Sequence, residues 1–158
     1  MIAATSTPRL VVEHGAGEVA IEQGGVLGPV LRRLAGLPEG ERCAVEFCVE
    51  RTATGVRWGR RYRTPTASTG CDTTVVATAV GFLERRGPVV MEFVLVDDDR
   101  ATLRSVRLFG VPLPRRMLSS RIESAAMDGG LRTEVWIVVG GGSIGWLRYV
   151  AELTEVTP

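Results

Sequence analysis

Three side chains of this sequence could take part in acid–base chemistry: Glu92, Tyr62 and Tyr149. Glu92 stands in the apolar segment 89–96 and shares one side of that segment with valines. A carboxyl group removed from water holds its proton more strongly, and the raised pKa suits a general acid or base. We therefore predict that Glu92 is catalytic and that the two tyrosine hydroxyls assist proton transfer. The alternative is that an arginine neutralises Glu92 in a structural ion pair.

Six further residues are predicted to line a pocket for an apolar ligand. Segments 89–96 and 135–139 are apolar on both faces, so each must be covered on both sides. In a small β-barrel, a bound ligand can cover the inward face of such a segment. A second copy of the chain can cover the outward face, which would make a homodimer. The alternative is that the aromatic side chains form an ordinary core. The predicted ligand-binding residues are Trp58, Arg60, Met91, Phe93, Trp136 and Trp146.

Several other chemistries are excluded by the residues that are missing. His14 is the only histidine, lysine is absent, and the three cysteines lack C-x-x-C spacing. We therefore expect no metal site, no Schiff base and no disulfide framework. Residues 140–145 match G-x-G-x-x-G, but residues 146–150 alternate like a strand where a dinucleotide site needs a helix. No cofactor is expected. Asp97–Asp99 is expected to form a solvated turn.

Composition indicates one globular domain over residues 1–158. Forty-five per cent of the residues are apolar, and the net charge is +1. Such a balance predicts neither a nucleic-acid nor a membrane partner. Segment 51–121 is locally basic, and Arg57, Arg61 and Arg63 alternate along one predicted strand. These arginines could bind an acidic partner, although an outward strand face is commonly charged and paired with neighbouring acids.

Hydrophobic periodicity predicts a mainly β (α+β) fold. Apolar residues recur every three or four positions over 25–37, which predicts an N-terminal amphipathic helix that packs across the sheet. Residues 43–50 alternate with a period of two and predict a strand. We expect an antiparallel β-barrel or a strongly curled meander sheet. The other predicted strands are 9–13 and 18–22, joined by a turn at Gly15 and Gly17, and 56–63, 71–84, 88–96, 101–109, 121–127, 131–139 and 144–153, with a helical turn near 115–119.

The sequence also predicts where the protein resides. No run of eighteen apolar residues is present, so no membrane span is expected. The first five residues lack the basic region and long apolar stretch of a signal peptide. We therefore expect a cytoplasmic protein.

Four motifs occur in an order typical of one bacterial family. They are Trp-Gly-Arg-Arg-Tyr at 58–62, Gly-Phe-Leu-Glu-Arg-Arg-Gly-Pro at 81–88, Phe-Gly-Val-Pro-Leu-Pro-Arg at 109–115 and Gly-Trp-Leu-Arg-Tyr at 145–149. Over about residues 15–153 the chain is similar to the bacterial domain of unknown function 4166. In that family the domain can also follow a saccharopine-dehydrogenase-like reductase. The resemblance implies a self-contained domain and no catalytic residues, and the Gly-Gly-Gly-Ser loop departs from the family's usual last turn.

Three functions are consistent with these features. The first is a barrel that binds an apolar or amphiphilic small molecule in its interior. The second is a cofactor-independent cyclase or isomerase that folds a polyketide-like natural-product intermediate in a dry pocket. The third is an Arg-rich interaction domain, whose binding would depend strongly on salt.

Overall fold

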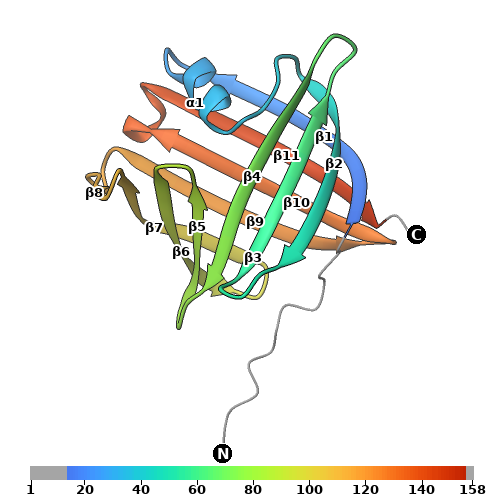
Figure 1. Ribbon diagram of the computed structural model, residues 1–158. Helices are drawn as coiled ribbons and strands as arrows, with labels where there is room; N and C mark the ends of the chain where they lie inside the picture. The colour runs from blue at the N-terminus through green and yellow to red at the C-terminus, as the bar shows by residue number, and fades with distance from the viewer. Residues whose placement is uncertain (1–13, 156–158) are drawn as a thin grey trace, which may run out of the picture.

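The computed structural model describes residues 14–155 and consists mainly of β-strands (Figure 1). One short helix and one 3₁₀ turn accompany the strands in this range. The elements are β1 His14–Gly24, α1 Gly28–Leu34, β2 Arg42–Arg51, β3 Val56–Arg63, β4 Ser68–Ala77, β5 Gly81–Arg86, β6 Val89–Asp97, β7 Arg100–Leu108, β8 Val111–Pro112, β9 Leu118–Met127, β10 Gly130–Val139, η1 Gly140–Gly142 and β11 Gly145–Glu155. None of the helices within this range is long and apolar enough to cross a membrane.

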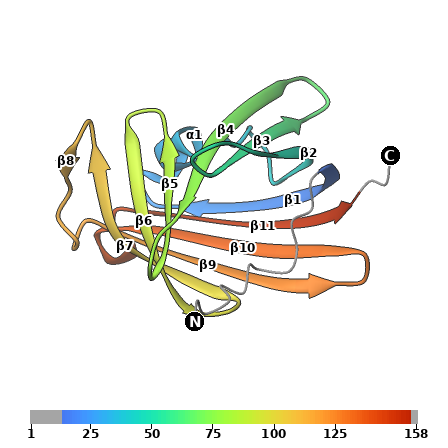
Figure 2. The ribbon, with the colours of Figure 1, turned by 60° about the horizontal axis from the view of Figure 1, so that its bottom comes forward.

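Ten of the strands close into an antiparallel β-barrel. The hydrogen-bonded order is β6-β5-β4-β3-β2-β1-β11-β10-β9-β7, and the pairing of β6 with β7 completes the circle. β8 lies outside this circle and pairs only with β7. Figure 2 shows β1, β11, β10 and β9 side by side as one wall, with β3, β4 and β5 curling over the opposite side. Closure leaves these ten strands without an unpaired edge over most of their length.

The wall is least complete between β7 and β9. These strands pair only through Arg100–Thr102, whereas β7 continues to Leu108. Residues 109–117 occupy the space beside the unpaired part, and the Leu113 amide donates to the Val106 carbonyl. A small hollow of about 90 Å³ remains there.

The predicted turn at Gly15 and Gly17 is wrong, because β1 runs through both residues. Gly15 pairs with Phe47 on one side, and Gly17 pairs with Val45 and Leu153 on its two sides. A Cβ at Gly17 would lie 1.9 Å from the Glu152 carbonyl oxygen. Glycine is therefore required here because the two backbones approach closely. The predicted strand 9–13 lies outside the described residues.

The single strand predicted over 71–84 is two strands. β4 ends at Ala77, and the chain turns through residues 78–80 before β5 begins at Gly81. The Thr78 amide donates to the Gly81 carbonyl, and the Gly81 amide donates to the Thr78 hydroxyl oxygen. Without a strong Gly-Pro or Asn-Gly signal in this region, the alternating pattern concealed the turn. The helical turn expected near 115–119 is a single turn in which the Met117 amide donates to the Pro114 carbonyl, and β9 begins at Leu118.

Helix α1 lies at the end of the barrel opposite the one at which β11 ends (Figure 1). It has seven residues and buries Leu31, whereas Val30 and Leu34 are exposed. The segment after the helix buries Leu37, and the Gly36 carbonyl accepts a 3.5 Å hydrogen bond from the Thr69 hydroxyl of β4. The helix and the segment that follows it therefore connect β1 and β11 to β4 across this end of the barrel.

Most of the buried apolar residues form one group in the interior. This main buried group comes from β1–β4, β11 and the α1 region, and includes Val19, Val45, Tyr62 and Leu147. Phe93, Ala101, Val106 and Val135 are also buried, but they come from β6, β7 and β10 and do not belong to the main buried group. On β1, β2 and β11 the buried residues occupy alternating positions, which defines the inward face of these strands.

Candidate ligand site inside the barrel

Trp58, Arg60 and Tyr62 all face the interior from β3, as their spacing predicts. Tyr62 is 2% exposed and belongs to the main buried group, and Trp58 packs against that group. Arg60 pairs with Cys71 on the neighbouring strand β4, and Cys71 is buried like Tyr62. The arginine is therefore carried into the barrel by the same alternation that buries its apolar neighbours.

Arg60 is the most unusual polar residue of the interior. Its Nη2 donates a 3.0 Å hydrogen bond to the Thr73 hydroxyl, and it lies 3.7 Å from Glu84 Oε1. The Nε atom is buried and has no partner, and it is the one such side-chain nitrogen or oxygen among residues 14–155. Burial opposes the charge of Arg60, but nearby ionisable groups, led by Tyr62 and Tyr149, raise the pKa above its ordinary value. The guanidinium therefore remains charged inside the barrel.

Two tyrosine hydroxyls lie near this guanidinium. Burial raises the pKa of Tyr62 and that of Tyr149, and the positive charge of Arg60 opposes the rise in both cases. Tyr149 comes from β11, where it pairs with Val135 and Ile21, so it reaches the interior from the wall beside β1. Both hydroxyls therefore hold their protons at neutral pH and can donate hydrogen bonds.

The interior carries more positive than negative charge. Among the described strands, the charged residues that occupy inward positions and are not exposed are Arg60, Glu84 and Arg86, whereas Arg51 at the end of β2 shares the inward face but is exposed. The Arg86 guanidinium lies against Gly36 and close to Cys71, in the space that a side chain at Gly36 would fill. One carboxylate thus faces two guanidinium groups. An enclosed charge that lacks a counter-charge is unfavourable, so this interior is suited to an anion.

Aromatic and flexible side chains surround the polar residues. Phe47 stacks on Trp58 with ring centroids 6.0 Å apart, and the Arg60 guanidinium lies 5.8 Å from the Trp58 centroid. Phe82 stacks on Phe93 at 5.0 Å. Met91 lies opposite Glu84 and Val106 on the inward face of β6. The predicted ligand-binding residues Trp58, Arg60, Met91 and Phe93 therefore all face inward.

Several inward residues are only half-buried, although the barrel surrounds them. They come from strands all around the barrel. A side chain in the middle of a filled core makes contacts on all sides and is buried, so partial burial here shows that part of each side chain is left uncovered by the protein. These half-buried inward residues are Arg60, Glu84, Met91, Ile122, Thr133, Ile137 and Tyr149.

Glu92 does not join this site. It lies opposite Leu83 and Ser105, at positions that alternate with the inward residues Met91 and Phe93. Its carboxylate accepts a 3.0 Å hydrogen bond from the Ser105 hydroxyl and lies 3.6 Å from Arg104 Nη1. The structure thus places Glu92 on the outward face, apart from Tyr62 and Tyr149.

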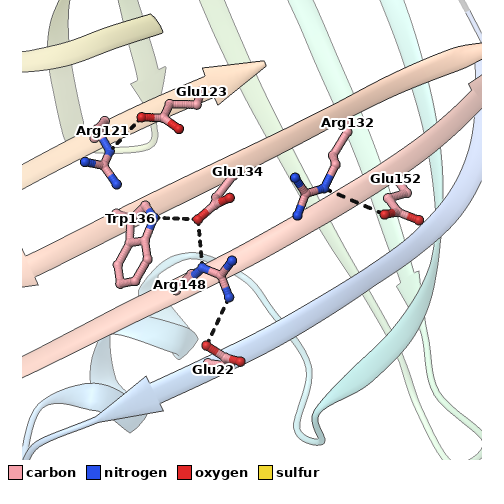
Figure 3. A network of polar contacts seen from close by, with 8 residues as sticks. All are labelled: Glu22, Arg121, Glu123, Arg132, Glu134, Trp136, Arg148 and Glu152. Carbon is pink, nitrogen blue, oxygen red and sulfur yellow. Dashed lines mark hydrogen bonds and ion pairs between the residues drawn. The ribbon is translucent and has the colours of Figure 1, made fainter. Parts of the chain in front are cut away.

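Trp136 and Trp146 also lie on the outward face. Figure 3 shows the polar network around Trp136, which spans β9, β10, β11 and β1. Trp136 Nε1 donates to Glu134 Oε1, and the Arg148 guanidinium lies 5.1 Å from the Trp136 centroid. Trp146 lies beside Trp136, with centroids 6.3 Å apart. The outward side of the apolar segment 135–139 is therefore covered in part by arginine side chains.

Two larger hollows lie on the outside of the barrel. One, of about 400 Å³, is bordered by the acidic turn Asp97–Asp99 and by Glu123 and Glu134. The other, of about 490 Å³, lies over β2–β4 at Gly59 and Gly70, which have no side chains to fill it. His14 and Cys48 are opposite each other at its margin, and both are exposed. Trp58, Tyr62, Phe93 and Tyr149 line neither hollow, whereas Arg60 borders the second one.

Sequence reasoning missed Thr73, Glu84 and Arg86. Glu84 and Arg86 stand in one of the quoted motifs, and their spacing of two places them on one face of a strand. That face becomes the inward one only through the pairing of Val75 with Glu84 between β4 and β5. The spacing of Glu84 and Arg86 therefore indicated that they share a face. Only the position at which β5 begins shows that this face is the inward one.

Comparison with protein-family models, with curated proteins and with solved structures finds no match for this chain. The similarity to the bacterial domain family stays a prediction.

Proposed function

We propose that the barrel binds an apolar or amphiphilic small molecule in its interior. The observation that carries this proposal is the set of inward side chains that stay partly exposed although the closed barrel surrounds them. Apolar walls with a few convergent polar groups are typical of small-molecule sites. Trp58, Met91 and Phe93 supply apolar surface, and Arg60 and Tyr149 supply polar groups.

A second candidate is a cofactor-independent cyclase or isomerase. Glu84 and Tyr149 favour it, because the Glu84 charge is close enough to Tyr149 to affect the pKa of its hydroxyl. A carboxylate and a phenol in one enclosed site can accept and donate a proton to a bound molecule. This candidate requires the same binding event as the first, so binding is the step to test first.

The Arg-rich interaction surface has less support. Arg57 forms a 2.7 Å ion pair with Asp72, and Arg63 forms a 3.2 Å ion pair with Glu46. Two arginines of the alternating row are thus already paired with acids on neighbouring strands. The expected cytoplasmic location and the expected lack of nucleic-acid and membrane partners stay predictions.

The binding proposal can be tested with Nile red, a neutral dye that becomes fluorescent in apolar surroundings. We expect the purified protein to bind the dye with a defined stoichiometry. Ile122→Trp would place a large side chain at an inward position and is expected to weaken binding at least tenfold. Glu123→Trp adds the same group one residue later, on the outward face, and should leave binding unchanged.

Circular dichroism and thermal unfolding establish that both variants fold. If Ile122→Trp does not fold, Ala151→Phe provides a second inward block on β11. Failure of the folded wild-type protein to bind the dye, or equal loss in the inward and outward variants, would contradict the proposal.

A further inference from the structure

We infer that the interior ligand carries one carboxylate group and that Arg60 binds it. This inference rests on the proposed function, because it concerns the ligand that the interior takes. It begins from the buried Nε of Arg60, which has no partner. A buried donor without an acceptor is costly, by about 1–3 kcal/mol in general and more for a charged group. Such a donor therefore needs explanation in a native structure.

The guanidinium has unused donors on a defined side. Its contacts with Thr73, with Glu84 and with the Cys71 sulfur, 3.8 Å away, all involve Nη2. Among the described residues, no hydrogen bond or ion pair involves Nε or Nη1. Arginine presents its five N–H groups in a planar fork, which matches the two oxygens of a carboxylate. The group is thus held by one nitrogen. Within residues 14–155, Nη1 has no partner and is not buried, so it is open to a ligand oxygen, whereas a ligand can approach Nε only if the side chains around it move.

Glu84 does not satisfy this guanidinium. The distance of 3.7 Å between Glu84 Oε1 and Arg60 Nη2 is too long for a hydrogen bond, and both side chains are 17% exposed. The interior also holds Arg86, so two positive charges face one negative charge. A single additional carboxylate makes the interior neutral. A doubly charged phosphate would exceed that balance and would be repelled by Glu84, which favours a monocarboxylate.

The tyrosine hydroxyls provide further donors. Burial raises the pKa of both groups, so each keeps its proton at neutral pH. Neither hydroxyl forms a hydrogen bond with another residue in the described part of the chain. A carboxylate near Arg60 could therefore accept from Tyr149 or Tyr62 as well as from the guanidinium. The apolar part of the ligand would lie against Trp58, Met91 and Ile122, which gives an amphiphile of fatty-acid chemistry.

The decisive experiment compares decanoic acid with 1-decanol as competitors of bound Nile red at pH 8. The two molecules share an alkyl chain and differ in charge. We expect the acid to displace the dye at a concentration at least tenfold below that of the alcohol. Arg60→Gln should abolish this preference, so that the acid and the alcohol displace the dye at similar concentrations. Arg61→Gln, which removes the adjacent outward charge, should keep the preference.

A second variant tests the same inference in the opposite direction. Glu84→Gln removes the competing carboxylate, so we expect the preference for the acid to increase several-fold. This variant keeps Arg60 in place and so remains informative if Arg60→Gln does not fold.

The outcomes separate the two proposals. If the wild-type protein binds neither Nile red nor the competitors, the proposed function fails. If acid and alcohol compete equally, interior binding stands and the carboxylate inference is overturned. An acid preference that Arg61→Gln removes as completely as Arg60→Gln also overturns it, because the effect would then arise from the surface charge.

Discussion

Arg148 Nε donates a 2.8 Å hydrogen bond to Glu134 Oε1 across the β10–β11 pair on the outer wall (Figure 3). The same oxygen accepts from Trp136 Nε1 at 2.7 Å, and Arg148 Nη1 continues to Glu22 at 3.1 Å. Arg148 of β11 thus links β10 to β1.

Glu134→Gln should therefore destabilise the barrel. Its side chain is 17% exposed, so water screens the contact with Arg148 only in part. We expect a decrease of about 1 kcal/mol in the free energy of unfolding, measured by denaturant titration. Arg132→Gln is the matched control, because its 3.7 Å pair with Glu152 is more exposed and should contribute less. Equal losses in the two variants would contradict this ranking.

The Glu134 contribution should also depend on pH. The hydrogen bond from Arg148 lowers the pKa of Glu134 in the folded protein. The stabilisation is therefore complete above the unfolded-state pKa of about 4.3 and is lost as the pH falls through the lower folded-state pKa. The difference in unfolding free energy between wild type and Glu134→Gln should be constant from pH 6 to 8 and should decrease below about pH 4. A difference that persists unchanged at acid pH would disprove this origin.

Tyrosine ionisation offers a direct measure of the interior. The chain has two tyrosines, and burial raises the pKa of each in the folded state. Ultraviolet titration should show less tyrosinate at pH 10 in the folded protein than in the unfolded chain, which should be about half ionised there. Because folding raises these pKa values, stability is complete below about pH 10 and decreases as the pH rises above it. Ordinary titration of either tyrosine in the folded protein would contradict its burial.

Gly17→Ala should test the close approach of β1 to β11. The new Cβ would lie 1.9 Å from the Glu152 carbonyl oxygen, so the two backbones must separate. We expect a loss of about 1–3 kcal/mol in the free energy of unfolding. Gly70→Ala is the control, because its Cβ would have no neighbour closer than 3.9 Å. Tolerance of alanine at Gly17 would show that the strands can move apart at little cost.

Thiol labelling should distinguish the three cysteines. Cys48 is exposed, whereas Cys43 and Cys71 are buried, and burial raises the pKa of the Cys43 thiol. With a chromogenic disulfide reagent, one thiol should react quickly in the folded protein and all three after unfolding. Cys48→Ser should remove the fast phase. A fast phase that remains in this variant would show that a buried thiol is accessible.

The local pattern predicted much of the fold. Residues 43–50 alternate, and β2 buries Cys43, Val45, Phe47 and Val49 as this alternation requires. Regular short strands indicated a barrel or a curled sheet, and the structure is a closed barrel. Closure itself depends on the pairing of β6 with β7, where the register shifts between Glu92 and Phe93. Such a bulge depends on contacts between strands, and no local spacing reveals it.

The interior site was harder to predict because the turn at 78–80 reverses the alternation. Inward residues of β4 have odd numbers, as in Cys71 and Thr73, whereas inward residues of β5 have even numbers, as in Glu84. An uninterrupted strand over 71–84 would place Glu84 on the face opposite Cys71. A prediction from spacing alone that misses this turn therefore places Glu84 on the outward face, away from Arg60. Trp136 was predicted to line the interior because it stands in an apolar segment. Its indole instead lies on the outward face, against Arg148.

The pairing of β1 with β11 also has a consequence for how the chain folds. Gly15 lies opposite Glu155, so strands from the two ends of the described chain are neighbours in the wall. Contacts between such distant segments slow folding, because a long loop must close before they form. During synthesis, β1 cannot obtain its second neighbour until β11 has left the ribosome. Until then the growing chain has an open sheet edge, and protection of that edge in the cell becomes a requirement for the native barrel.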